Sequence, residues 1–364
     1  MKDKLHVYVG TYSQPILFGT GELFKGKGKG IHQYDLDMET GELEESAPPT
    51  EAVNPSYLVQ SHDRNFLYAV NEMKEYQGKP QGSLSAYKIS GDGKLQLLNR
   101  VPTGGTDPCH VNISPDDRCV MVANYMSGSI CSYGVAEDGF LEEPWIFSQY
   151  YGRGADAKRQ MGPHAHSVVL TPDGRHAVVS DLGTDRLKIY KTDFDNKRIL
   201  TENVAEFETG AGSGPRFCTF NRIGTRCYVF CEITSTIMVL KYTEGNFELM
   251  QEVPSVVGKC SVENAGADIH LSPDDRFLYA SNRGQDSIVV YKLSENGTVE
   301  YVQTVSTYGR SPRNFSIDPT GRWLLAGNQD GDTIAVFERN RETGMLYHKR
   351  TVSVPTPVCI LISR

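Results

Sequence analysis

The chain has 364 residues and a formal net charge of −8, and 39% of its residues are hydrophobic, enough for a large core. The acidic balance argues against nucleic acid or an anionic membrane as the main partner, but allows a small anionic ligand held by local arginines. No segment has the roughly 18 consecutive apolar residues of a membrane helix. The start, MKDKLHVYVGTY, lacks the apolar stretch of a signal peptide, and the eight cysteines form no C-x-x-C pair. We therefore expect a cytoplasmic protein with free thiols.

The predicted elements are short strands. The chain opens with LHVYVGTY (5–12) and GIHQYDL (30–36), which resemble the second and third strands of a four-stranded unit that lacks its first strand. Six full units follow, with a period of about 45 to 55 residues, and such a period is typical of repeat architectures. Each unit has a strand, a tight turn such as S-P-D-D, a second strand and a third, and usually a fourth. The first strands begin near Asn54, Asp107, Gly162, Gly214, Gly266 and Ser311.

The last segment, TPVCILIS (356–363), resembles a first strand with nothing after it. Joined to the N-terminal strands, it completes a seventh unit and closes a ring, which leaves only short sheet edges. We therefore predict an all-β protein: a seven-bladed β-propeller with four-stranded antiparallel blades, one domain spanning residues 1–364. No long stretch has sustained helical periodicity, so a βαβ arrangement has little support.

The start of each first strand and the end of each second strand should lie on the same rim of the ring, because the two strands form a hairpin. The residues at these positions vary from unit to unit although the scaffold repeats. Asn and Asp at strand ends commonly begin turns, and we favour that interpretation for Asn71, Asn124 and Asn282. Turn formation explains Glu232, Arg216, Arg283 and Arg313 poorly, because these residue types do not favour turns. We therefore expect a pocket at this rim. The two columns are Ser56, Cys109, His164, Arg216, Asp268, Arg313 and Val358, and Asn71, Asn124, Asp181, Glu232, Asn282 and Asn328, with Arg283 one place later.

His164 and His166 stand two apart, so the period of a strand places them on one side. A zinc site would need a third ligand, with Asp181, Glu232, His110 and His270 as candidates. Nearby arginines would repel a cation, so we expect no metal and no cofactor. A pair of structural histidines is a second interpretation. We favour a role in proton transfer or substrate binding, because the ordinary pKa of histidine lies near neutral pH.

Six segments in order resemble the lactonase family of seven-bladed propellers, which includes 6-phosphogluconolactonases and a carboxy-muconate cyclase. They are RQMGPHAH (159–166), SDLGTDRL (180–187), GPRF (214–217), CEITSTI (231–237), SNRGQDSI (281–288) and SPRNFSIDPTGRWL (311–324). The resemblance implies a lactonase, a carboxylic ester hydrolase that opens a sugar-type lactone resembling 6-phosphogluconolactone. A muconate-type cyclase and a propeller that only binds a partner are the alternatives.

The resemblance also implies the site. Carried over by motif, the catalytic residues are His166, Glu232, Arg216 and Arg283, with His166 or Glu232 as the base. The expected substrate contacts are His164, Arg159, Asp181, Arg313 and, from its rim position, Asn328. The expected ligand is a small anionic or sugar lactone, and the oligomeric state stays open.

Two departures from the family pattern stand out. Phe217 occupies a position where the family usually has a histidine, so any role of that histidine is absent. Residues 13–30, SQPILFGTGELFKGKGKG, replace what is usually a short loop. Their composition favours a flexible loop, and a lid over the rim that alters substrate choice is the alternative.

Overall fold

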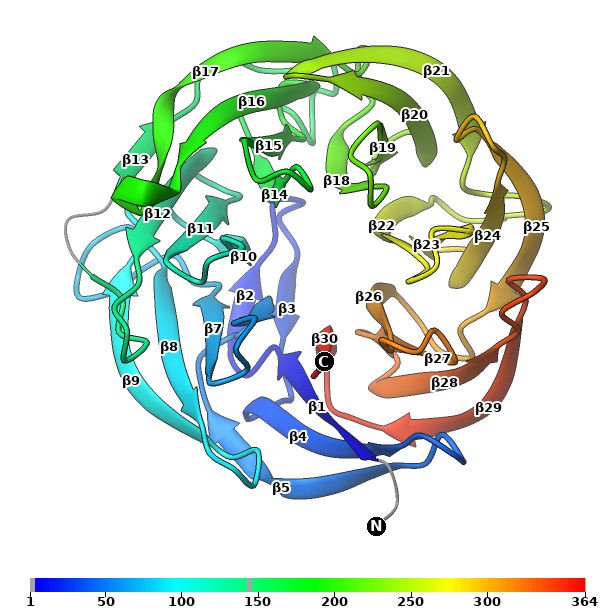
Figure 1. The fold of residues 1–364 in the computed structure, drawn as a ribbon, viewed down its shortest axis with the longest axis horizontal. Coiled ribbons are helices and arrows are strands. Elements are labelled where there is room, and N and C mark those ends of the chain that lie inside the picture. Colours follow the sequence, from blue (N-terminus) through cyan, green and yellow to red (C-terminus); the bar gives the residue numbers. More distant parts are fainter. Residues whose placement is uncertain (1–3, 143–145, 364) are drawn as a thin grey trace.

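The computed structural model describes residues 4–142 and 146–363, and only the backbone of residues 200–203. These residues form seven four-stranded antiparallel sheets around a central channel, together with a separate two-stranded hairpin (Figure 1). The helical content of the described chain is one 3₁₀ turn, η1 (Phe194–Asn196), so no helix in it could cross a membrane. The all-β seven-bladed propeller predicted from the repeat is confirmed.

The sheet that closes the ring joins the two ends of the chain. Its strands, from the channel outward, are β30 (Pro357–Ile362), β1 (Lys4–Thr11), β4 (Gly30–Asp37) and β5 (Leu43–Glu51). β30 pairs antiparallel with β1, with Val9 opposite Ile360 and Val7 opposite Ile362. The free edge of β1 is therefore covered by the last strand, as the sequence predicts.

The other six sheets follow in chain order, each with its first strand innermost (Figure 1). The second and third sheets contain β6 (Leu58–Gln60), β7 (Phe66–Asn71), β8 (Ser83–Ile89) and β9 (Leu95–Pro102), then β10 (Pro108–Ile113), β11 (Cys119–Asn124), β12 (Ser129–Gly134) and β13 (Ile146–Gln149). The fourth and fifth contain β14 (Ala165–Leu170), β15 (His176–Asp181), β16 (Arg186–Asp193) and β17 (Arg198–Glu208), then β18 (Pro215–Phe220), β19 (Arg226–Cys231), β20 (Thr236–Thr243) and β21 (Asn246–Pro254). The sixth and seventh contain β22 (Ala265–Leu271), β23 (Phe277–Arg283), β24 (Ser287–Leu293) and β25 (Val299–Ser306), then β26 (Pro312–Ile317), β27 (Trp323–Asn328), β28 (Thr333–Arg339) and β29 (Leu346–Ser353).

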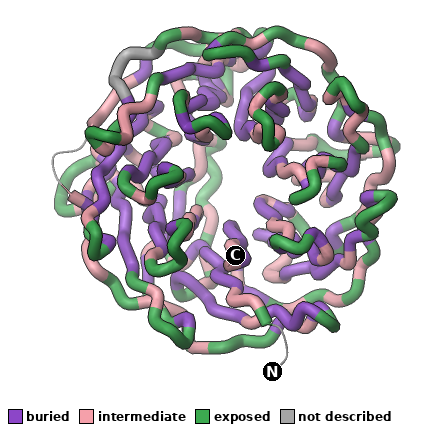
Figure 2. Tube along the Cα trace, viewed as in Figure 1, coloured by how far each residue is buried: buried purple, intermediate pink, exposed green. Residues whose placement is uncertain are grey.

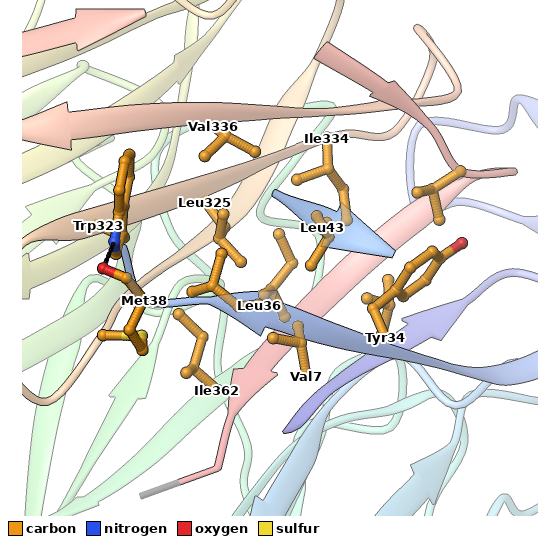
Figure 3. Close-up of a cluster of buried hydrophobic side chains, with 13 residues drawn as sticks. Val7, Tyr34, Leu36, Met38, Leu43, Trp323, Leu325, Ile334, Val336 and Ile362 are labelled. Atoms are coloured by element: carbon orange, nitrogen blue, oxygen red, sulfur yellow. Dashed lines mark hydrogen bonds between the residues drawn. The ribbon is translucent and has the colours of Figure 1, made fainter. Parts of the chain in front are cut away.

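The core lies between neighbouring sheets. The inner strands are buried and the outer strands and turns are exposed (Figure 2). The cluster between the seventh and first sheets shows the pattern (Figure 3): Leu325 and Val336 from one sheet pack against Val7 and Leu36 from the other. Apolar side chains that alternate along both faces of each inner strand therefore hold the blades together.

A repeated hydrogen bond also links each of several blades to the next. The hydroxyls of Tyr8, Tyr68, Tyr228 and Tyr279 donate to the carbonyl oxygens of Gly93, Gly139, Gly297 and Gly344, at 2.8 to 3.2 Å. In the seventh blade Leu325 occupies the tyrosine position. A related hydrogen bond comes from two residues earlier, where the indole Nε1 of Trp323 donates to Met38 O at 3.0 Å, across the point where the ring closes (Figure 3). A buried aromatic ring that needs one polar partner thus fixes the spacing of the blades.

Candidate active site

The first strand of most sheets carries a β-bulge at the same place beside the channel. In β14, Ala165 pairs with Asp181 and Ser167 with Ser180, so His166 is the extra residue. A bulge redirects the side chain of the extra residue. The residues at this position in five sheets are Cys109, His166, Arg216, Arg313 and Val358. This register corrects the first rim column, in which the sequence placed His164 rather than His166.

A second set of side chains that line the cavity comes from a position near the end of the second strand of a sheet, directly after the residue that pairs with the position before the bulge. The residues that make this pair in five of the sheets are Asn124, Asp181, Cys231, Asn282 and Asn328. Glu232 therefore lies one place later than the sequence column put it, in line with Arg283. The residues at this later position that line the cavity are Glu72, Tyr125, Glu232, Arg283 and Gln329.

These two sets surround a cavity of about 240 Å³ at the mouth of the channel. Five of the predicted site residues line it: Arg159, His166, Glu232, Arg283 and Arg313. Arg216 lies beside a smaller cavity that His166 and Arg313 also line. The fold thus brings together residues that are more than 150 positions apart in the sequence.

Glu232 is the centre of an arginine cluster. It is 3% exposed, and its Oε2 lies 2.8 Å from Arg216 Nε and 2.9 Å from Arg283 Nη2. Arg159 donates to its other oxygen, Oε1. Burial acts to raise the pKa of Glu232, but Arg283, Arg159 and Arg216 outweigh it and hold the pKa well below its usual value. Glu232 is therefore ionised at neutral pH and a weak base.

Burial lowers the pKa of two of these arginines. It lowers the pKa of Arg216 to about 10, with a further contribution from Arg283, and it lowers the pKa of Arg283. Arg283 Nη2 also donates to Gly266 O at 2.8 Å, and Arg216 donates to Ala267 O. Both guanidinium groups are thereby fixed in position and remain cations at neutral pH.

His166 differs from Glu232 in its charge. Its imidazole is 5% exposed and lies at an edge-to-face distance of 5.4 Å from the Tyr125 ring. Burial, and then the charge of Arg216, lower its pKa well below the usual 6.5. The ring is therefore neutral at pH 7 and has a nitrogen lone pair that can accept a proton.

His164 lies outside the lining of the cavity. Its ring stacks on Tyr125 at 4.6 Å, and its Nδ1 lies 3.0 Å from Tyr125 O, so the two predicted histidines share one tyrosine while only His166 lines the cavity. Burial lowers the pKa of His164. Throughout the described residues, no three His, Cys, Asp or Glu side chains converge in a way that could hold a metal ion.

The side chains of Asp181 and Asn328 bond to neighbouring loops and do not line the cavity. Asp181 accepts hydrogen bonds from His164 N at 2.8 Å and Thr184 Oγ1 at 2.6 Å. Asn328 Nδ2 donates to Thr307 O at 3.0 Å, in the same way that Asn282 donates to Ser255 O at 2.9 Å. The structure thus brings five predicted residues into the cavity and places these two behind it.

The cavity residues that were not singled out from the sequence include Glu72, Asp107 and Tyr125. Glu72 Oε2 accepts a hydrogen bond from Tyr12 at 2.9 Å and lies 3.9 Å from Arg313 Nη2. The Arg313 guanidinium lies over the Tyr12 ring, 5.4 Å from its centre. Glu72 directly follows Asn71, and Tyr125 directly follows Asn124. Arg283 follows Asn282 in the same way, so its position in the sequence indicated that these two residues also face the cavity.

The insertion forms a hairpin over the cavity instead of the flexible loop that its composition favoured. β2 (Pro15–Leu17) pairs with β3 (Leu23–Lys25), and this roof hairpin (residues 15–25) lies over the channel opening in Figure 1. Phe18 and Phe24 pack on Tyr12, with ring centres 5.8 and 5.9 Å apart, and both line the cavity. At the tip of the roof hairpin, Gly19 lies close against the Tyr125 ring, since a Cβ added at Gly19 would be only 3.1 Å from that ring.

Phe217 lies below the cavity, at the position where the resemblance leads one to expect a histidine. It is 5% exposed, and its ring centre lies 5.0 Å from His110 and 5.7 Å from Tyr57. It lines only the smaller cavity. An apolar ring thus closes the floor beneath His166 and contributes to the burial that keeps that imidazole neutral.

Comparisons with known proteins identify the family and the fold. The family model described as "Lactonase, 7-bladed beta-propeller" matches residues 6–362. The chain belongs to this family. The lactonase-family relatives include a Bacillus subtilis protein named 6-phosphogluconolactonase, which is 35% identical over 97% of each chain.

Solved structures of the same lactonase family have the same fold. A Bacteroides fragilis protein described as a putative 6-phosphogluconolactonase superimposes with a TM-score of 0.88, at 35% identity over 99% of this chain and 98% of that one. A periplasmic gluconolactonase of Pseudomonas aeruginosa has a TM-score of 0.89, at 28% identity over 100% of this chain and 99% of that one.

Proposed function

We propose that this protein is a lactonase that hydrolyses a sugar-type lactone resembling 6-phosphogluconolactone to the open acid. The observation that carries the proposal is a neutral imidazole, His166, and an ionised Glu232 with its arginines around one cavity. Two relatives are named 6-phosphogluconolactonase, which supports the substrate class.

In the proposed reaction, His166 accepts a proton from water as the water oxygen adds to the lactone carbonyl carbon. The carbonyl becomes a tetrahedral oxyanion, which the Arg283 guanidinium stabilises by donating a charge-assisted hydrogen bond. The intermediate then collapses and the ring C–O bond breaks. The imidazolium of His166 returns its proton to the departing alkoxide, which leaves the hydroxy acid and the enzyme in its starting form.

Glu232 has a different role in this proposal. Both its oxygens already contact arginines, so neither is free to take a proton from water. We assign it to holding Arg159, Arg216 and Arg283 in position, so of the two candidate bases we choose His166. Arg216, which lies beside the smaller cavity, supports Glu232 from below.

Arg313 and Arg159 are the proposed contacts of a distal anionic group, such as a phosphate. Arg313 lines the cavity and makes no contact with Glu232 within the described chain, and its one carboxylate neighbour there, Glu72, is 3.9 Å away, which leaves donors for a ligand. His164, Asp181 and Asn328 take positioning roles: His164 supports the Tyr125 ring, and the other two hold the loops behind it.

The test is titration of released acid with 6-phosphoglucono-δ-lactone, glucono-δ-lactone and a cyclic muconate lactone. Rapid hydrolysis of the phosphorylated sugar lactone, well above its spontaneous rate, supports the proposal. Exclusive activity on the muconate lactone would favour the cyclase. No activity on any of the three, with a protein partner recovered in pull-down, would favour a binding propeller. We expect the protein in the cytoplasm, and cell fractionation tests that.

A further inference from the structure

The cavity has two sides of opposite charge. The arginine cluster around Glu232 comes from the fifth and sixth sheets and the segment before β14. Glu72, after β7, and Asp107, before β10, come from the second and third sheets, which lie across the central opening from β18 and β22 (Figure 1). Both carboxylates line the cavity. The function proposed above gives the arginines their roles but assigns none to these two acids.

One carboxylate oxygen of Asp107 has no hydrogen-bond donor among the described residues. The residue is 2% exposed, and Lys74 binds its Oδ2. Its Oδ1 is buried and accepts no hydrogen bond from any described residue. A buried acceptor of this kind is normally satisfied, and an unsatisfied one calls for an explanation. A hydroxyl group of a bound ligand would supply the missing donor.

Glu72 is held in a similar way. It is 5% exposed, and its Oε2 accepts the hydroxyl proton of Tyr12 at 2.9 Å. The contacts of its carboxylate with Tyr12 and Arg313 both use Oε2, so neither contact occupies Oε1, and the residue lines the cavity. Tyr12 is fully buried under the roof hairpin and therefore fixes the orientation of this carboxylate.

An ionised carboxylate only accepts hydrogen bonds, so it selects ligands that donate them. Burial, and then the nearby Glu72, raise the pKa of Asp107 to about 6, so it is mainly ionised at pH 7. An anion placed directly against Asp107 would be repelled, and an apolar ligand there would leave Oδ1 unpaired. A polyhydroxylated chain has the chemistry that fits, because each hydroxyl donates one hydrogen bond.

We propose that Asp107 and Glu72 bind the hydroxyl groups of the lactone substrate and make the site specific for a polyhydroxylated one. The proposal rests on the function proposed above, since it places the reacting lactone carbonyl on the arginine side. Charge-assisted hydrogen bonds to buried carboxylates are among the stronger polar contacts. These two residues are therefore specificity residues and take no part in the proton transfer.

The test compares the binding of 6-phosphogluconate with that of 6-phosphonooxyhexanoate by titration calorimetry. The two acids have the same chain length, carboxylate and phosphate, and differ only in four hydroxyl groups. We expect wild-type protein to bind 6-phosphogluconate at least about tenfold more tightly. Asp107→Asn and Glu72→Gln should each remove most of that preference and change binding of the hydroxyl-free acid less than about twofold.

Glu22→Gln is the matched control, because Glu22 is an exposed carboxylate on the roof hairpin that also lines the cavity. It should leave the preference unchanged. The proposal is overturned if wild-type protein binds both acids equally, if the two variants keep the preference, or if Glu22→Gln reduces it equally. Preferential binding of 6-phosphogluconate by a protein that hydrolyses no lactone would instead disprove the proposed function and leave this inference intact.

Discussion

Arg283 Nη2 lies 2.9 Å from Oε2 of Glu232, and the Glu232 side chain is only 4% exposed. Removing one member of a buried ion pair leaves an uncompensated charge, which costs about 3 to 5 kcal/mol. We predict that Glu232→Gln lowers the free energy of unfolding by about that amount, measured by urea denaturation, and lowers turnover at least about 100-fold.

The control for this variant is Glu248→Gln. Glu248 pairs with Lys241 at 3.6 Å but is 73% exposed, so its loss should cost less than about 1 kcal/mol. Equal losses of stability in the two variants would show that the arginine cluster does not depend on Glu232.

His166→Ala should lower kcat by two orders of magnitude or more, because the proposed general base is lost. The measurement is initial-rate titration of released acid with the best lactone. His176→Ala is the control, since His176 bonds to Tyr242 away from the cavity. A variant of His166 that keeps more than a tenth of wild-type kcat would contradict the assignment.

The pH profile should show the depressed pKa of His166. A free imidazole is half protonated near pH 6.5, but burial and Arg216 lower the pKa of His166 well below this value. The active, neutral form therefore persists as the pH falls, so kcat/KM should stay constant down to pH 6.5 and decline only at lower pH. After subtraction of spontaneous hydrolysis, an acid limb centred at or above pH 6.5 would contradict this prediction.

Phe18→Ala tests the roof hairpin. Phe18 packs against Tyr12 and Phe24 and lines the cavity, so its loss opens the roof. We expect KM to rise by about threefold to tenfold while kcat changes less, because a lost aromatic contact costs about 1 kcal/mol. Leu23→Ala is the matched control on the same hairpin, since Leu23 is 60% exposed. Equal effects of the two variants would mean that the hairpin does not contact substrate.

Phe217→His would restore the residue that the family usually has. Phe217 is packed between Tyr57 and His110, where an added imidazole lacks an evident partner, so we expect a loss of about 1 to 3 kcal/mol in unfolding free energy. Turnover should stay within tenfold of wild type, because Phe217 does not line the main cavity. A gain in activity would show that the missing histidine has a catalytic role that this chain has lost.

The fold was predictable from the sequence because the repeat recurs with its turns intact, and even the closing strand, residues 357–362, was recognisable as an unpaired first strand. The sequence predicted five of the residues that line the cavity, but its rim columns were wrong by two positions at His166 and by one at Glu232. His166 and Arg313 project into the cavity because each is the extra residue of a β-bulge, and a bulge has no fixed sequence pattern. The first column was aligned on the residue after each proline, and Pro163 lies two residues earlier than the equivalent prolines of the other strands, so His164 was placed in it. Glu232 was misplaced by one because Cys231 pairs with the position before the bulge.

Other parts of the site depend on contacts between distant segments. Nothing near Asp107 in the sequence shows that Lys74 would bind one of its oxygens and leave the other unpaired. The glycine and lysine content of residues 13–30 indicated a flexible loop. In the structure Phe18 and Phe24 pack against the Tyr12 ring, and these contacts hold the hairpin in place. Such partners are known only once the blades are arranged.

The pairing of β30 with β1 also bears on how the protein is made. While the chain leaves the ribosome, β1 is among the first strands to emerge, and its partner is among the last. Until then the growing chain has an unsatisfied sheet edge and Trp323 has not yet met Met38. The arginines, His166 and Glu232 reach their final spacing only when the ring closes, so a nascent or prematurely terminated chain should be inactive and dependent on chaperones.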